Sequence, residues 1–130
     1  MKTVVRLMPV VMLLIGASSI FAAEATQMWK CEAEENISEA QMKAMAGEWV
    51  KAAKAMPGGA GMEVHLYFPV AVNDAGDFDL WLVIVTPSFE DWGKFWDNYE
   101  GSPAEAIDMR NAEDGVACPD SAVFESVKIE

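Results

Sequence analysis

The sequence is poor in the side chains from which most metal and catalytic centres are built. It contains a single histidine, His65, and two cysteines, Cys31 and Cys118. One imidazole cannot form a multi-histidine metal site, and both the C-x-x-C redox pattern and the G-x-S-x-G nucleophile motif are absent. The aspartates between residues 74 and 79 do not have the spacing of an EF-hand loop. We therefore expect no metal site and no resident cofactor.

Basic residues are also scarce. The chain has 9 Lys and Arg against 21 Asp and Glu, which gives a formal net charge of −12. A surface of this sign repels phosphate, so nucleic acid and anionic membranes are excluded as partners. The acidity is suited to solubility, or to attracting a cationic ligand or partner.

Long hydrophobic runs are missing except at the N-terminus. There, Lys2 and Arg6 precede an apolar run over residues 7–15, which is too short to span a bilayer. This is the pattern of a signal peptide. No cysteine near its end could carry a lipid, and no second run of spanning length follows. The sequence thus predicts export without a stable membrane anchor.

The end of this segment offers two cleavage sites, after Ala23 and after Ala25. We interpret residues 1–25 as a cleaved signal peptide of bacterial type and residues 26–130 as one mature domain. The mature part is long enough for one compact core and too short for two. The expected location is the periplasm or the extracellular medium.

The two cysteines, Cys31 and Cys118, both fall in the mature part. An even pair in an oxidising compartment indicates a structural disulfide. The alternative, a redox pair, lacks the C-x-x-C pattern. Closing so long a loop stabilises the fold by roughly 4–5 kcal/mol in the chain-entropy model.

The stretch from Asp77 to Gly101, DFDLWLVIVTPSFEDWGKFWDNYEG, organises the rest of the chain. Side chains alternate along a strand, and from Phe78 to Val85 both sets are apolar. Such a strand needs cover on two sides and belongs at the centre of a sheet. Aromatic residues then recur at helical spacing: Phe89, Trp92, Phe95, Trp96 and Tyr99. We interpret this stripe first as core packing, with a ligand-stacking wall as the alternative.

Turn and cap signals divide the mature chain into alternating elements. Strands are predicted at residues 27–33, 62–72, 78–85 and 123–129, and helices at 38–56, 88–99 and 102–111. A turn at 73–76 would join the second and third strands as a hairpin, and 113–121 are expected to form a loop. Gly47, inside the first helix, suggests close packing against the sheet.

The resulting β-α-β-β-α-β order is that of the ferredoxin-like α+β fold. It predicts a four-stranded antiparallel sheet in the order 4-1-3-2, with the helices on one face. The second strand then lies at an edge, where Pro69 is tolerated. Cys31 and Cys118 lie at neighbouring ends of the first and fourth strands. The disulfide and the topology come from separate features of the sequence, and they agree.

One face of such a sheet carries no helices and would present Trp, Val and Leu side chains to water. A twofold homodimer that packs sheet on sheet is the common solution. The element order, the strand ending in TPSFEDW and the divided second helix DNYEGSPAEAI are similar to those of the dimeric α/β-barrel superfamily. The resemblance covers the chain from Gln27 to Glu130 and implies such a homodimer. It implies no particular activity, because members include cofactor-free monooxygenases, haem-degrading enzymes and proteins without known activity.

The resemblance also implies a pocket between the sheet and the helices. The candidate pocket residues are His65, Tyr67, Trp81, Trp92, Trp96 and Arg110. His65 would act as a general base or haem ligand, because it is the one side chain that titrates near neutrality. The alternative is an exposed edge-strand histidine. Two functions follow: an exported binding module for a small apolar or aromatic ligand, or a small monooxygenase-like, possibly haem-related enzyme with His65 in an aromatic pocket.

Overall fold

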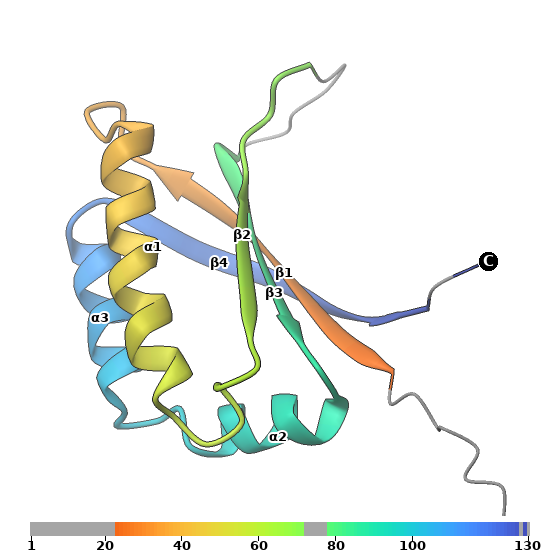
Figure 1. Ribbon diagram of the computed structural model, residues 1–130. Helices are drawn as coiled ribbons and strands as arrows, with labels where there is room; N and C mark the ends of the chain where they lie inside the picture. Colours follow the sequence, from red (N-terminus) through yellow and green to blue (C-terminus); the bar gives the residue numbers. More distant parts are fainter. Residues whose placement is uncertain (1–22, 72–77, 128, 130) are drawn as a thin grey trace, which may run out of the picture.

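The computed structural model describes residues 23–71, 78–127 and 129. Its strands and helices are β1 (Glu24–Ala33), α1 (Glu39–Lys54), β2 (Glu63–Tyr67), β3 (Leu80–Thr86), α2 (Phe89–Asp97), α3 (Pro103–Glu113) and β4 (Val116–Ser126). The strands form one antiparallel sheet in the order β2-β3-β1-β4 (Figure 1). The predicted ferredoxin-like α+β fold is therefore confirmed, including the edge position of β2.

The strand β3 lies inside the sheet, between β2 and β1, as its two apolar faces predict. On one face Leu80 and Ile84 are each 2% exposed, and on the other Val83 is 3% exposed. Helices α1 and α3 cover the first face, and α2 lies across the end of the sheet at which β3 finishes (Figure 1). The main core forms between these helices and the sheet around Phe95, which is fully buried, and Trp49.

Each helix begins at a serine that the sequence marks as a cap. The hydroxyl groups of Ser38, Ser88 and Ser102 accept hydrogen bonds from backbone N–H groups three residues later, at 3.3, 3.0 and 3.1 Å. Such caps contribute about 1 kcal/mol each, because they satisfy donors that have no partner inside the helix. These local signals fix where the helices start.

A disulfide joins Cys31 in β1 to Cys118 in β4 across a sequence separation of 87 residues, which confirms the predicted bridge. The register between the two strands shifts between Lys30 and Glu32, beside the disulfide. The bridge closes a loop that contains α1, β2, β3, α2 and α3, so it constrains nearly the whole domain in the unfolded state.

The predicted bounds of three strands are wrong. Strand β1 begins at Glu24 rather than at Gln27, and β4 ends at Ser126 rather than at Ile129. Strand β2 ends at Tyr67, and Pro69 lies beyond it; the predicted turn at 73–76 lies outside the described residues. The loop predicted over 113–121 is already strand from Val116 onward. Pro119 fits there because it lies at the register shift, where a missing N–H removes no ladder bond.

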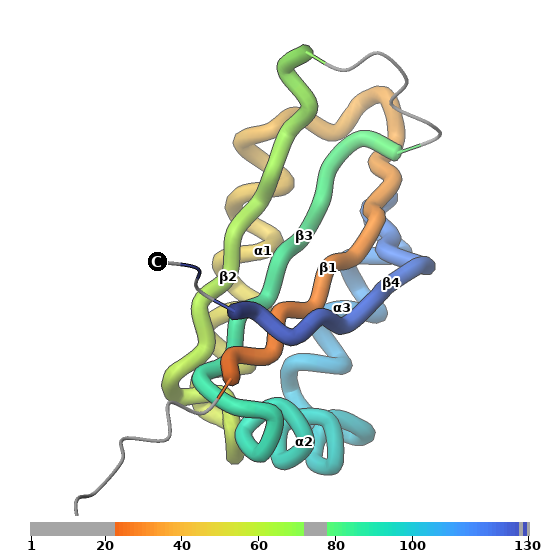
Figure 2. Tube along the Cα trace, turned by 90° about the vertical axis from the view of Figure 1, so that its right-hand side faces the viewer, coloured from red at the N-terminus to blue at the C-terminus, as the bar shows by residue number. Residues whose placement is uncertain are grey.

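The face of the sheet opposite α1 and α3 carries no helix (Figure 2). Cross-strand pairs place its side chains: His65 lies opposite Val83, and Tyr67 lies opposite Trp81. Further along, Phe124 of β4 lies opposite Thr26 of β1. Tyr67 and Phe124 are 52% and 50% exposed. We call this surface the open face.

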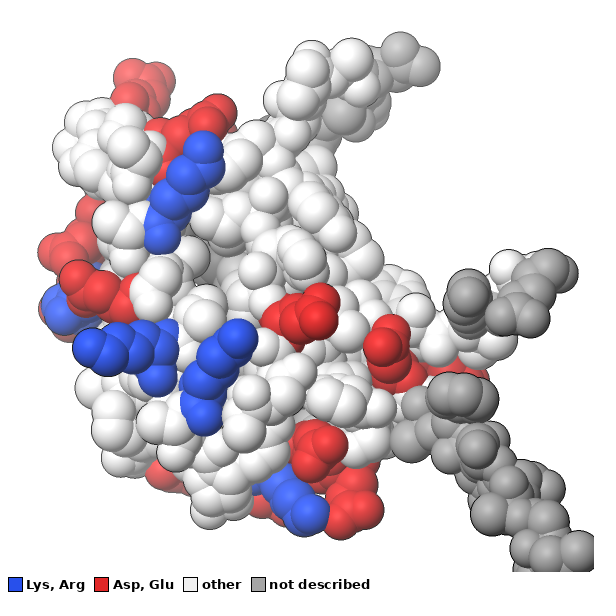
Figure 3. All heavy atoms as spheres, viewed as in Figure 1, with Lys and Arg blue, Asp and Glu red and all other residues white. Residues whose placement is uncertain are grey.

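The helical side of the molecule carries basic and acidic side chains interleaved over α1 and α3 (Figure 3). Ion pairs at i,i+4 spacing, Glu39 with Lys43 in α1 and Glu90 with Lys94 in α2, are exposed and contribute little to stability. Within the described part of the chain, none of the helices combines the length and apolarity needed to cross a bilayer.

Two glycines provide a matched test of this packing. Gly58 has φ +79°, and a Cβ there would lie 2.2 Å from the Asp91 carbonyl oxygen, whereas a Cβ on Gly47 would meet nothing within 4 Å. The expectation of close packing at Gly47 is thus wrong. We predict that Gly58→Ala lowers the free energy of unfolding by at least about 2 kcal/mol. Gly47→Ala should raise it by about 0.5–1 kcal/mol.

Both values come from urea unfolding followed by circular dichroism. A Gly58→Ala protein as stable as the parent would show that the α1–β2 connection does not pack on α2 as described.

Candidate ligand-binding site

A cavity of about 100 Å³ lies between the sheet and helices α1 and α3. Its sheet side is formed by Leu66 of β2, by alternate residues of β3 and by Trp29 and Cys31 of β1. The helices contribute methionine, alanine and Trp49 from α1, and Asp108 and Asn111 from α3. Because side chains alternate along a strand, Leu80, Leu82 and Ile84 of β3 all point toward the helices, and they form the floor of the cavity.

Aromatic rings form one wall of the cavity. The ring centroids of Trp29 and Trp96 are 5.8 Å apart, and those of Trp96 and Tyr99 are 4.7 Å apart, both in tilted arrangements. Phe95 lies behind them, 6.0 Å from Trp49 in an edge-to-face contact. Such pairs add about 0.5–1.5 kcal/mol beyond their burial. The wall is therefore both part of the core and a surface on which a flat molecule could stack.

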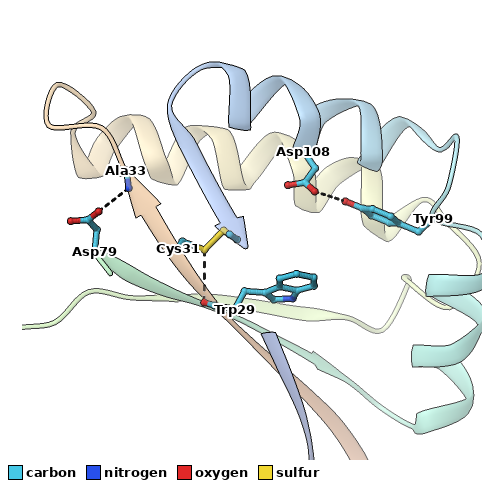
Figure 4. Close-up of a disulfide and its surroundings, with 7 residues drawn as sticks. Trp29, Cys31, Ala33, Asp79, Tyr99 and Asp108 are labelled. Carbon is cyan, nitrogen blue, oxygen red and sulfur yellow. Dashed lines mark hydrogen bonds between the residues drawn. A yellow bond between two sulfur atoms is a disulfide. The ribbon is translucent and has the colours of Figure 1, made fainter. Parts of the chain in front are cut away.

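A chain of hydrogen bonds crosses the cavity from α1 to α3. The indole Nε1 of Trp49 donates to the hydroxyl of Tyr99 at 3.2 Å, and that hydroxyl donates to Oδ2 of Asp108 at 3.2 Å. Figure 4 shows Asp108 pointing from α3 toward Tyr99, above the Trp29 ring. Asp108 is exposed as a residue, so its carboxylate lies at the rim of the cavity, where the neighbouring groups reduce its solvation.

This partial burial changes the acidity of both groups. Loss of solvation raises the pKa of the Asp108 carboxyl above its usual 3.8, although the hydrogen bond from Tyr99 acts in the opposite direction. Burial likewise raises the pKa of the Tyr99 phenol, with a smaller opposing effect from the bond with Trp49. Tyr99 is therefore a stable donor at neutral pH, and the ionised form of Asp108 is less favourable in the folded protein than in water.

Three buried polar atoms of cavity-lining residues have no hydrogen-bond partner among the described residues. They are Nε1 of Trp29, Nε1 of Trp96 and Oδ1 of Asn111. Buried polar groups are nearly always paired, and an unpaired one costs about 1–3 kcal/mol. Water or a molecule that enters the cavity could satisfy these atoms, so they are candidate contacts for a ligand.

Of the pocket residues predicted from the sequence, the structure brings Trp96 to this cavity. Trp92, one helical turn earlier, lies elsewhere: its Nε1 donates to Oε1 of Gln27 at 3.0 Å, and Gln27 in turn donates to Ser121 Oγ at 3.3 Å. Trp92 therefore holds α2 against β1 and β4 and does not line the cavity.

The other predicted residues lie on different surfaces. His65, Tyr67 and Trp81 are on the open face, where His65 stacks on Tyr67 and its Nε2 lies 3.7 Å from Glu63. Arg110 pairs with Glu48 in a shallow groove outside α1 and α3. The structure therefore does not place His65 beside the aromatic cavity.

Sequence reasoning missed Trp29 and Trp49 and, more tellingly, Asp108 and Asn111. A signal was present in α3. Its buried and half-buried positions, Ala104 and Ile107, recur at helical spacing, and Asp108 and Asn111 continue the same stripe. Polar residues on the inward stripe of a helix indicate a pocket rather than a closed core.

The structure also accounts for one of the acidic residues near the start of β3, Asp79. The carboxylate of Asp79 accepts a hydrogen bond from the backbone N–H of Ala33 at 2.8 Å (Figure 4). Asp79 thereby ties the start of β3 to the end of β1. Within residues 23–71, 78–127 and 129, no group of three potential metal ligands is found.

Comparison with known proteins places the fold. No protein-family model matches the chain, and no curated protein matches it by sequence. Solved structures do match. A hydroxynitrile lyase from Passiflora edulis has a TM-score of 0.54 at 14% identity, covering 85% of this chain and 96% of that one. SnoaB, a cofactor-independent oxygenase from Streptomyces nogalater, also has a TM-score of 0.54, at 11% identity, covering 83% and 97%.

A Dabb-family protein of ferredoxin-like fold from Mesorhizobium loti has a TM-score of 0.52 at 8% identity, covering 83% of this chain and 99% of that one. The chain thus has a ferredoxin-like fold, and the resemblance seen in the sequence is confirmed for the fold. At these identities the likeness concerns fold alone, since one fold supports many functions.

The raised pKa of Asp108 makes a prediction about stability. The folded protein binds a proton at Asp108 more tightly than the unfolded chain does. Protonated Asp108 therefore adds to the free energy of unfolding below the usual pKa of the carboxyl, and this contribution is lost as pH rises through the pKa of the folded state. We expect the wild type to gain stability relative to Asp108→Asn as pH falls from neutrality toward 4. Urea unfolding at a series of pH values measures this difference.

Glu113→Gln removes one exposed charge from the same helix and serves as the control. A difference curve for Asp108→Asn that stays flat, or that has the opposite slope, would show that burial does not govern the acidity of Asp108.

Proposed function

We propose that this chain is an exported, homodimeric binding protein that holds one small apolar or aromatic molecule in the cavity between its sheet and helices. The proposal rests on one observation: a single cavity is lined both by an aromatic wall and by polar atoms of Trp29, Trp96 and Asn111 that have no partner among the described residues. Ligand sites combine an apolar lining with a few polar groups that fix orientation, and this cavity has both.

The size of the cavity limits the ligand. Cavities of roughly 150 Å³ hold benzene, and sites for drug-sized molecules run to roughly 300–1,000 Å³. The cavity here measures about 100 Å³. That volume supports a molecule with one ring, part of which protrudes at the rim, and it argues against a tetrapyrrole such as haem.

Binding is favoured over the monooxygenase-like alternative by the position of His65. A general base must reach the proton that it removes, and His65 lies on the open face. The titratable side chains that line the cavity are Asp108 and Tyr99, which are engaged with each other. The fold hosts a lyase and an oxygenase in other organisms, but in this chain the cavity residues suit recognition better than proton transfer.

Export is supported by the N-terminal signal pattern and by the disulfide, which belongs to an oxidising compartment. The structure bears on the cleavage site. Glu24 and Ala25 belong to β1, Ala25 is fully buried, and its carbonyl accepts a hydrogen bond from Thr86 Oγ1 at 3.2 Å. Cleavage after Ala23 would leave β1 whole, whereas cleavage after Ala25 would remove its first two residues.

The open face supports the homodimer. Its exposed side chains include Tyr67 of β2 and Phe124 of β4, with the half-buried Trp81 and Met28 on the two strands between them. Monomeric proteins rarely leave large apolar patches in water. A second copy related by a twofold axis would cover it with the same residues, because an isologous interface is self-complementary.

Toluene tests the cavity as a single-ring probe. We expect saturable binding to the mature protein with a dissociation constant of about 0.1–1 mM, which corresponds to roughly 4–5.5 kcal/mol and lies well below the ceiling of about 1.5 kcal/mol per non-hydrogen atom. Ala46 lines the cavity, so Ala46→Met should fill the space and weaken toluene binding at least about tenfold. Calorimetry or ligand-observed NMR measures both.

Ala40→Met places the same side chain at an exposed position of α1 and should leave toluene binding unchanged. If toluene does not bind saturably, or if Ala46→Met binds it as well as the parent does, the cavity is not the binding site.

Light scattering tests the homodimer. We expect the mature protein to have the mass of two chains at tens of micromolar. Phe124→Glu should shift it to monomer, because an interface does not tolerate an unpaired buried charge. Met109→Glu, on α3 at 61% exposure, is the matched control and should stay dimeric. A monomeric parent, or equal dissociation in both variants, would contradict the sheet-face dimer.

A further inference from the structure

We infer that the molecule held in the cavity is a small organic cation, an amine whose ammonium group lies at the rim against Asp108 and Asn111 while its ring enters among the tryptophans. The inference rests on the proposed binding function and names the chemical class of its ligand. It follows from the kind of polar atoms at the rim, from the aromatic wall and from the charges around the site.

The rim of the cavity offers hydrogen-bond acceptors on one helix. Asp108 and Asn111 are three residues apart in α3, so their side chains lie on the same side of it. Tyr99 donates to one carboxylate oxygen of Asp108, and Oδ1 of Asn111 is buried without a partner among the described residues. An ammonium group carries three donors and no acceptor, so it can satisfy the amide oxygen and contact the carboxylate at the same time.

The aromatic wall is suited to the same charge. A cation within about 6 Å of an aromatic face gains roughly 0.5–2 kcal/mol from the ring quadrupole, most strongly with tryptophan. Trp29, Trp96 and Tyr99 form a continuous cluster along the cavity. A ligand with its ring on this wall would place a substituent on the α3 side, beside Asp108.

The charges near the rim are predominantly negative. Asp108 lines the cavity, and Glu105, one turn earlier in α3, acts on both Asp108 and Tyr99. The nearest basic group from α3, Arg110, is paired with Glu48 of α1 on the outer side. An anionic ligand would therefore be repelled, and the net charge of −12 would attract a cation from solution.

The reduced solvation of the Asp108 carboxylate is a further reason why the site favours a cation. Its raised pKa shows that the ionised form is held in the folded protein at a cost. A bound ammonium group would offset that cost, whereas a neutral ligand of the same shape would not. The site is thus more complementary to an amine than to an alcohol.

The experiment uses three single-ring probes of nearly equal size: benzylamine, benzyl alcohol and benzoate. At pH 7 we expect the mature protein to bind benzylamine at least about tenfold more tightly than benzyl alcohol, which is the scale of a charge-assisted hydrogen bond. Benzoate should bind more weakly than either. Asp108→Asn should lower the benzylamine to benzyl alcohol affinity ratio to about one, whereas the exposed Glu113→Gln should keep it.

A second readout needs no variant. Acidification protonates Asp108, so in the wild type the same affinity ratio should fall between pH 7 and pH 4, while benzylamine itself stays charged. If benzyl alcohol binds as tightly as benzylamine at pH 7, or if the ratio is indifferent to both Asp108→Asn and pH, the cationic class is wrong although the cavity still binds. If toluene and all three probes fail to bind, the binding function itself is wrong.

Discussion

Strand β3 must be covered on both faces, and this requirement governs the rest of the architecture. Its residues alternate between large apolar side chains on either side, so neither face can be left in water at low cost. The helices meet the requirement on one face. Because bulky rings such as Trp49 of α1 and Trp29 of β1 stand between the helices and the sheet, the two layers enclose a cavity rather than a fully closed core. The site and the core therefore have the same origin.

The two faces of the sheet carry different surfaces. The helical face holds the cavity, with Asp108 at its rim, and the open face holds His65, Tyr67 and Phe124 on neighbouring strands. Association through the open face and occupation of the cavity would use separate side chains of the same strands. A change in β3 would then reach both, because consecutive residues such as Leu82 and Val83 point to opposite sides.

Much of the fold could be predicted from the sequence because its signals are local. Ser38, Ser88 and Ser102 mark helix starts through bonds made within three residues, and the apolar alternation of β3 is contained in one segment. The ends of β2 and β4 could not be predicted, because they depend on pairing. Residues 116–122 contain Pro119 and polar side chains, and only the partner strand β1 makes them a strand.

The site was harder to predict because its residues come from several elements. Trp92 and Trp96 share one stripe in the sequence, yet one bonds to Gln27 and the other lines the cavity. Side chains alternate along β2, so His65 points to the face opposite that of Val64 and Leu66, which face the helices. This alternation could have been read from the sequence, and it would have excluded His65 from the pocket. No local pattern in the sequence predicts that Trp29, Tyr99 and Asp108 lie together at the cavity.

The disulfide has a consequence for where the protein can work. Cys31 and Cys118 both line the cavity, so one wall of the site is held by a covalent bond between β1 and β4. That bond forms only where thiols can be oxidised. In a reducing compartment the chain would carry every lining side chain without this crosslink, so this wall of the cavity is complete only where thiols are oxidised.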